Sequence, residues 1–166
     1  MRSVLSAGHG HGLLPRQGER HRPSGHLTHR HSVPSPTGNR LEVPVTDLIY
    51  TATNTRGSII EANAVFTRVS GYGREDLLGV PHNLIRHPDM PGGVFRAIWN
   101  ELMSGQAASG YVQNLTADGT AYWTYATFTP GGGGHLSIRQ RPCTEMFPVI
   151  VDLYADVRRH ERELRA

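Results

Sequence analysis

The sequence of 166 residues contains no lysine, a single cysteine and no long apolar run. Its 17 basic residues are all arginine, which we interpret as codon bias rather than chemistry. Cys143, the lone cysteine, excludes an intrachain disulfide and a thiolate zinc cluster, as fits a reducing compartment. The longest apolar run, residues 149–151, is far shorter than the roughly 20 apolar residues of a membrane span. Residues 1–14 lack the apolar stretch of a secretory signal, so we expect a cytoplasmic protein without a membrane span.

Charge is distributed unevenly along the chain. Residues 1–40 carry six arginines and one acidic residue, whereas the remainder carries 11 arginines and 13 acidic residues. These first 40 residues are rich in His, Pro, Gly and Ser and lack apolar periodicity, so they cannot bury enough surface to offset the entropy of ordering. We therefore predict a disordered tail over residues 1–40. A basic tail can attract nucleic acid or anionic lipid, but we favour a solvated extension and expect no nucleic-acid partner.

From Asp47 onward, short β-type runs and short helices alternate. The expected strands are residues 48–53, 58–61, 110–116, 121–129 and 135–141, and the expected helices start near residues 64, 74 and 94. Asn63 is placed to cap the first helix through its side-chain oxygen. The order β-β-α-α-α-β-β-β over residues 47–141 predicts an α+β fold, in which a five-stranded antiparallel sheet carries short helices on one face. Such packing leaves a cavity between the sheet and the helices.

Two sequence motifs resemble signatures of the PAS domain family. The first, FTRVSGYGREDLLG at residues 66–79, resembles the pattern at the helical start of PAS domains. The second, DGTAYW at residues 118–123, resembles their later hairpin. Because both motifs occur at the spacing that the family shows, residues 47–141 are identified as a PAS domain, which implies a sensor.

A third segment is more specific. PHNLIRHPDMP at residues 81–91, followed by Phe95 and Trp99, is similar to the PAS domains of bacterial aerotaxis receptors. That resemblance implies that FAD is bound noncovalently and that redox or oxygen status is reported to a partner protein. The positions that match flavin-associated residues of the family are Asn63, Arg86, His87, Asp89, Trp99 and Asn114.

The chemistry of Asn114 is compatible with a flavin. On the expected strand of residues 110–116, period two places Val112 and Asn114 on the same face, so both face the core if Val112 does. A buried carboxamide needs hydrogen-bond partners for its donor and its acceptor, and the edge of a flavin pyrimidine ring offers both. The alternative is that Asn114 bonds to a neighbouring loop.

The other candidate residues have plain structural alternatives as well. Arg86 and His87 are donors suited to a phosphate or a carbonyl, and Trp99 offers an aromatic surface. Alternatively, Arg86 pairs with Asp89 three residues later and Trp99 is an ordinary core residue. We favour the flavin interpretation for the combination.

Competing functions are distinguished by what the folded part contains. It shows no nucleophile–base set, phosphate-binding loop or metal motif, so we expect no enzyme. A light-sensing LOV domain needs a cysteine near residues 83–89, where none occurs. A haem-binding PAS domain needs an axial ligand such as His87, but the flanking match favours flavin. The main alternative is a PAS module without a cofactor that serves in dimerisation or protein docking.

The C-terminal segment, residues 144–166, is predicted to form a signalling or dimerisation helix. Thr144 would be its N-cap, and Pro148 would lie in the first turn, where proline is tolerated. Four apolar residues follow the spacing of a helix that packs against another helix: Phe147, Ile150, Tyr154 and Val157. We expect this stripe to contact a second copy or a separate signalling protein; the alternative is that the helix folds back on its own sheet.

Overall fold

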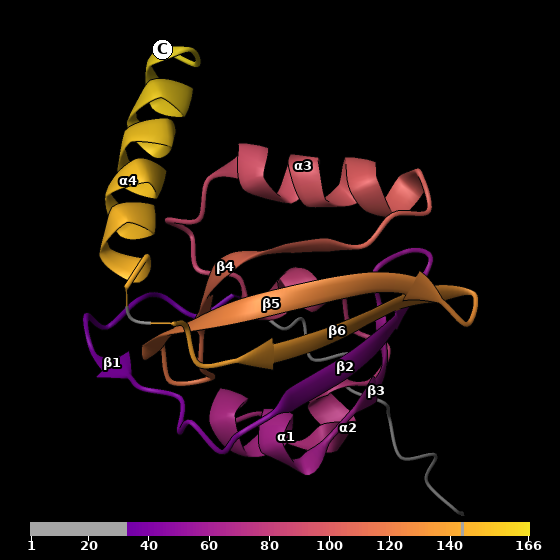
Figure 1. The fold of residues 1–166 in the computed structure, drawn as a ribbon. Helices are drawn as coiled ribbons and strands as arrows, with labels where there is room; N and C mark the ends of the chain where they lie inside the picture. The colour runs from indigo at the N-terminus through magenta and orange to yellow at the C-terminus, as the bar shows by residue number, and fades with distance from the viewer. Residues whose placement is uncertain (1–32, 144) are drawn as a thin grey trace, which may run out of the picture. The chain divides into compact units, whose positions relative to one another are not determined.

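A computed structural model of the chain describes residues 33–143 and 145–166. In chain order its elements are β1 (Arg40–Leu41), β2 (Ile49–Asn54), β3 (Ile59–Ala62), α1 (Ala64–Ser70), α2 (Arg74–Leu77), the 3-10 helix η1 (His82–Ile85), α3 (Gly92–Met103), β4 (Ala108–Leu115), β5 (Ala121–Gly131), β6 (Gly134–Gln140) and α4 (Phe147–Glu163). Figure 1 shows these elements around one curved sheet. The predicted α+β order is therefore confirmed.

The sheet contains six strands within the described residues. Five of them, in the spatial order β4-β5-β6-β2-β3, pair antiparallel as predicted. The sixth, β1, is an addition to the predicted sheet and pairs parallel to β5 through Arg40 and Leu41. Strand β1 was not predicted because two residues are too few to show the alternation of inward and outward side chains that marks a strand. Four of the helical segments lie between β3 and β4 in the sequence and so precede the long β4–β5–β6 meander.

Residues just before β1 also join the domain. The backbone nitrogen and Oγ1 of Thr37 donate to the carbonyl of Gly119 at 3.0 and 3.2 Å. The carbonyl of Asn39 accepts from Ala121 at 2.9 Å. The predicted tail boundary at Arg40 is thus a few residues too late, because local composition does not reveal pairing with a distant strand. The prediction for residues 1–32 lies outside the described residues.

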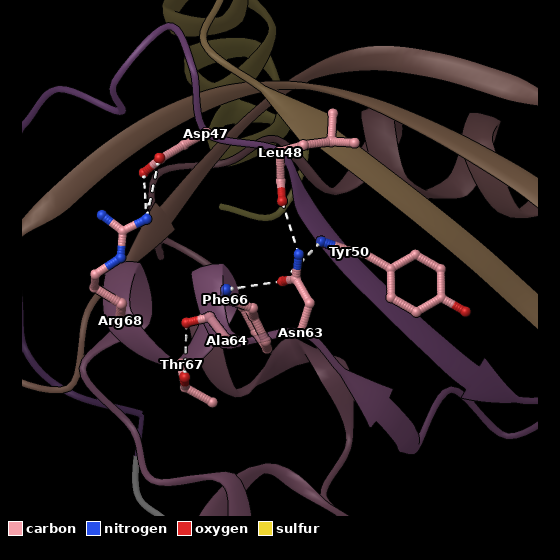
Figure 2. Close-up of polar contacts among 8 residues, drawn as sticks. All are labelled: Asp47, Leu48, Tyr50, Asn63, Ala64, Phe66, Thr67 and Arg68. Carbon is pink, nitrogen blue, oxygen red and sulfur yellow. Dashed lines mark hydrogen bonds and ion pairs between the residues drawn. The ribbon is translucent and has the colours of Figure 1, made fainter.

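The start of α1 is built around Asn63 (Figure 2). Its Oδ1 accepts from the backbone nitrogens of Phe66 at 3.0 Å and Tyr50 at 3.2 Å, and its Nδ2 donates to the carbonyl of Leu48 at 2.8 Å. The predicted N-cap is confirmed, and the same side chain also fastens α1 to the beginning of β2. Gly71 ends the helix with a φ of 73°, a conformation that glycine adopts without strain.

The core has two parts. The larger one lies among β2, β3, α1, α2 and η1 and is apolar; its most buried members are Val43, Ile49, Ile59, Phe66, Leu77 and Ile85. The smaller one lies near α3, β4 and β5 and is centred on Met90, Val112 and Ala126. Half-buried aromatic residues complete the smaller cluster, so this side of the domain is packed less completely.

The last hairpin turns tightly. Gly131 pairs with Gly134, and the two residues between them, Gly132 and Gly133, have φ values of 61° and 77°. Positive φ at both central positions is the requirement of a type I′ turn, whose twist matches that of the flanking strands. Strands β5 and β6 therefore extend into the glycine run, further than the predicted strand ends at residues 129 and 135.

Helix α4 lies against its own domain. Phe147 and Tyr154 approach the ring of Trp123, with centroids 5.3 and 6.1 Å apart, respectively. The predicted apolar stripe is thus half-buried within the same chain, as in the fold-back alternative. Val149 and Leu153, on the other side of the helix, are 57% and 51% exposed. The helix begins at Phe147 with Met146 in the N-cap position, so the predicted cap Thr144, which lies outside the described residues, is corrected. Pro148 is in the first turn as expected.

Candidate ligand cavity

A cavity of about 290 Å³ lies between α3, η1 and the strands β2, β4 and β6. Small-molecule sites in proteins commonly occupy roughly 300–1,000 Å³, so this cavity is at the small end of that range. Its apolar wall comes from both layers: Ile98 and Leu102 on α3, Val112 on β4 and Phe128 on β5. The cavity predicted between sheet and helices is therefore present.

Asn114 faces this cavity from β4. It is 2% exposed and lies beside Val112, which is 3% exposed, as period two predicts. Its Nδ2 is buried and has no hydrogen-bond partner among the described residues. Asn114 Nδ2 therefore does not make the alternative hydrogen bond to a neighbouring loop. An unpaired buried donor is costly, and an acceptor atom placed in the cavity could satisfy it.

Arg86 and Trp99 also line the cavity. The Nη2 of Arg86 donates to the carbonyl of Met90 at 2.8 Å, and its guanidinium lies 4.3 Å from the centre of the Phe95 ring. Burial lowers the pKa of Arg86. Trp99 is 39% exposed and meets His135 edge-on at 5.1 Å between ring centroids. Trp99 is thus not an ordinary core residue; it lines the cavity and is partly exposed to solvent.

Three other predicted site residues do not line the cavity. Asn63 is the N-cap described above. His87 is 5% exposed, and its Nδ1 accepts from the backbone nitrogen of Asp89 at 3.0 Å, while burial lowers its pKa. Asp89 is exposed and pairs with Arg158 of α4 at 2.6 Å, so the Arg86–Asp89 pair is not formed. His87 and Asp89 thus belong to the loop after η1, and Asn63 belongs to the start of α1.

Sequence reasoning missed Arg139 of β6, which lines the inner end of the cavity. It is 2% exposed, and its Nη1 donates to Thr51 Oγ1 at 3.2 Å. Its Nη2 lies 2.7 Å from His82 Nε2. Burial lowers the pKa of Arg139 to about 10, while burial and Arg139 hold the pKa of His82 well below its ordinary value. His82 is therefore neutral, and its Nε2 accepts the hydrogen bond.

The cavity lining combines arginine side chains with neutral polar groups. Among the described residues, none of those that line the cavity is Asp or Glu. Besides Asn114 and Arg139, the lining includes Ser137 and His135, whose Oγ and Nδ1 are buried without partners. A cationic group that is buried without a carboxylate favours a ligand with anionic or acceptor atoms. The arrangement is suited to binding such a ligand.

Among the described residues, no helix is long and apolar enough to cross a membrane. Across the same residues, no cluster of three or more His, Cys, Asp or Glu side chains is placed to hold a metal ion.

Comparison with known proteins identifies the family. Residues 59–132 match the family described as PAS fold. The aerotaxis receptor of Escherichia coli is 37% identical over 111 residues, which are 64% of this chain and 22% of that protein. The biofilm dispersion protein BdlA of Pseudomonas aeruginosa is 34% identical over 83 residues, 48% of this chain and 20% of that protein. The chain thus spans about a fifth of the length of these relatives.

Solved structures agree at the level of the fold. The light-state structure of the blue-light photoreceptor Aureochrome1 LOV superposes with a TM-score of 0.53 and 18% sequence identity, covering 64% of this chain and 88% of that one. Similarity at that identity concerns the fold alone. Together with the family match, it leads to one conclusion: residues 59–132 form a PAS domain.

Proposed function

We propose that this chain is a non-enzymatic, cytoplasmic sensor module that binds FAD noncovalently and reports redox or oxygen status to a partner protein. The observation that carries the proposal is the buried, unpaired Nδ2 of Asn114 in a cavity lined by Trp99 and Arg86. The likeness to the aerotaxis receptor of Escherichia coli supports the choice of flavin.

The residues of the cavity fit a flavin by their chemistry. Asn114 would donate to a carbonyl of the ring edge, and Trp99 would cover an aromatic face. Arg86 and Arg139 would stabilise negative charge on the ligand. When bound, the flavin supplies reversible electron transfer. The protein's own contribution is to bind and orient the ring, and to provide donors whose interactions differ between the redox states.

A second candidate function is a cofactor-free PAS module for dimerisation or docking. It is favoured by the positions of Asn63, His87 and Asp89, which are flavin-associated in the resemblance but do not line the cavity. The apolar residues Val149 and Leu153, exposed on α4, would then belong to a protein contact.

Purified full-length protein separates the two functions. We expect a yellow solution with a flavin absorption spectrum, or quenching of FAD fluorescence when apoprotein is titrated with FAD. Asn114→Ala and Trp99→Ala should each weaken FAD binding at least tenfold while circular dichroism stays unchanged. Asn100→Ala, on the exposed side of α3, is the matched control. A wild-type protein that is colourless and leaves FAD fluorescence unchanged refutes flavin binding and supports the second function.

A further inference from the structure

The amino terminus of α3 is capped by another helix. Pro91 occupies the N-cap position and makes no side-chain cap bond, and the first turn of α3 has no acidic residue. Glu161 of α4 supplies both missing interactions: its Oε2 accepts from Gly92 at 3.0 Å and its Oε1 accepts from Gly93 at 2.7 Å. These bonds lower the pKa of Glu161, with the Gly93 bond as the larger cause. The carboxylate also lies at the positive end of the helix dipole.

The local sequence of α3 permits this approach. A Cβ on Gly93 would lie 3.1 Å from Glu161 Oε1, tighter than ordinary contact, whereas a Cβ on Gly92 would lie at 3.7 Å. Glycine is a poor helix former and a weak start for α3 on intrinsic propensity. Gly93 thus makes room for the carboxylate, and the two glycines together give α3 a weak intrinsic start.

A second set of contacts joins α4 to the loop before α3. Arg158 pairs with Asp89 at 2.6 Å and also donates to the carbonyl of Pro88. Arg162, one turn further along α4, lies 3.8 Å from the same carboxylate. The first half of α4 is held by aromatic contacts with Trp123, and its second half is held by these charged contacts. Figure 1 shows α4 standing beside the amino-terminal end of α3.

The segment that α4 holds is also a wall of the cavity. Arg86, at the start of the loop, bonds to the carbonyl of Met90 and stacks over Phe95. Trp99 and Ile98 follow in the next turns of α3 and line the same cavity. Displacing the start of α3 therefore moves side chains that would contact a ligand.

We propose that Glu161 and Arg158 are positioning residues for the ligand cavity, and that ligand occupancy and docking of α4 stabilise each other. Because the coupling between two sites is reciprocal, a ligand that orders α3 must strengthen the docking of α4 by the same factor. The identity of the ligand as FAD rests on the proposed function, whereas the positioning role concerns the chain itself. In this scheme, α4 is the element through which the cavity acts on a partner.

The test uses the full chain and compares Glu161→Gln with Glu163→Gln, whose carboxylate is exposed and contacts only His160 among the described residues. Hydrogen exchange is measured for residues 92–103 and 147–163, with and without FAD. We expect faster exchange in both segments for Glu161→Gln, and FAD binding weakened by about two- to fivefold, the range of a helix-dipole contact. Glu163→Gln should behave as the wild type. FAD should slow exchange in α4 of the wild type, and less so in Glu161→Gln.

The outcomes separate the two proposals. If the wild type binds FAD but FAD and Glu161→Gln both leave exchange in α3 and α4 unchanged, the positioning role is wrong. If the wild type does not bind FAD but Glu161→Gln speeds exchange in α3, flavin binding is wrong and the positioning role stands. Arg158→Gln provides an independent variant, since it removes the contact with Asp89 without touching α3. Unchanged exchange at residues 88–93 in that variant also counts against the proposal.

Discussion

Helices α1 and α3 begin in opposite ways. Asn63, adjacent to α1 in sequence, caps it and ties it to β2 within 15 residues. By contrast, α3 is capped by Glu161, which is 68 residues after Gly93. The first arrangement forms wherever the local chain folds. The second exists only while α4 is docked. The order of the α1 side therefore depends on local contacts, whereas the order of the α3 side depends on the docking of α4. The cavity lies on the α3 side.

The largest expected effect is a contrast between the two sides. Phe66 on α1 is fully buried in the apolar core, so Phe66→Ala should lower the free energy of unfolding by about 3–5 kcal/mol. Trp99 on α3 is 39% exposed, and Trp99→Ala should cost only about 1 kcal/mol while abolishing most FAD binding. Urea denaturation and FAD titration measure the two quantities. Equal losses of stability would show that the α3 side is as firmly packed as the α1 side.

Removing each cap in turn sharpens the comparison. Asn63→Ala removes three hydrogen bonds around α1 and should cost about 1–2 kcal/mol of global stability. Glu161→Gln should change global stability by less than about 1 kcal/mol, because α3 opens locally before the domain unfolds. Chemical denaturation gives both values. A larger loss of global stability for Glu161→Gln than for Asn63→Ala would show that the cap of α3, not that of α1, supports the whole domain.

Acid should act on the α3 side first. The pKa of Glu161 is lowered below its ordinary value of 4.5 by the backbone bonds from Gly93 and Gly92. Its stabilising contribution is therefore present above that ordinary value and is lost as the pH falls through the lowered pKa. Arg165 and Arg96 are the charged neighbours that act in the same direction. Protection factors, which correct for the slowing of intrinsic amide exchange in acid, should fall in α4 of the wild type as the pH drops below 4.5. Glu161→Gln should lack this pH-dependent loss of protection.

The smallest expected effect comes from the two glycines. Gly93→Ala raises helix propensity but crowds Glu161 Oε1, whereas Gly92→Ala raises propensity with ordinary contact. We expect Gly92→Ala to slow exchange in α3 slightly and Gly93→Ala to speed exchange in α4. If both variants slow exchange in α4, the carboxylate adjusts without cost and the close approach has no role.

The local features of this fold were accessible from the sequence. The cap at Asn63 and the alternation that turns Asn114 inward each depend on neighbouring residues, and the structure contains both. The features that were missed are non-local. The bond from Glu161 to Gly93 and the pairing of Arg40 with β5 join segments that are distant in sequence.

Strand β6 shows a further reason why part of the site escaped prediction. Its apolar residues Leu136 and Ile138 are 37% and 45% exposed, whereas Ser137 and Arg139 are nearly buried. The usual rule places the apolar face of a strand inward. Here that rule points to the wrong face, because the polar residues Ser137 and Arg139 line the cavity. Polar residues on the inward face of a strand indicate a binding surface, but the inward face can be identified only once the fold is known.

The placement of the tryptophans has a practical consequence. The sequence contains two: Trp99 at the mouth of the cavity, and Trp123 beneath α4 between Phe147 and Tyr154. Replacing one with phenylalanine leaves the other as the sole indole fluorophore, so emission then reports on a single region. The protein therefore carries its own optical probes for the two ends of the proposed signal path. Stopped-flow fluorescence on the two single-tryptophan variants would time the cavity and the helix separately, without an attached dye.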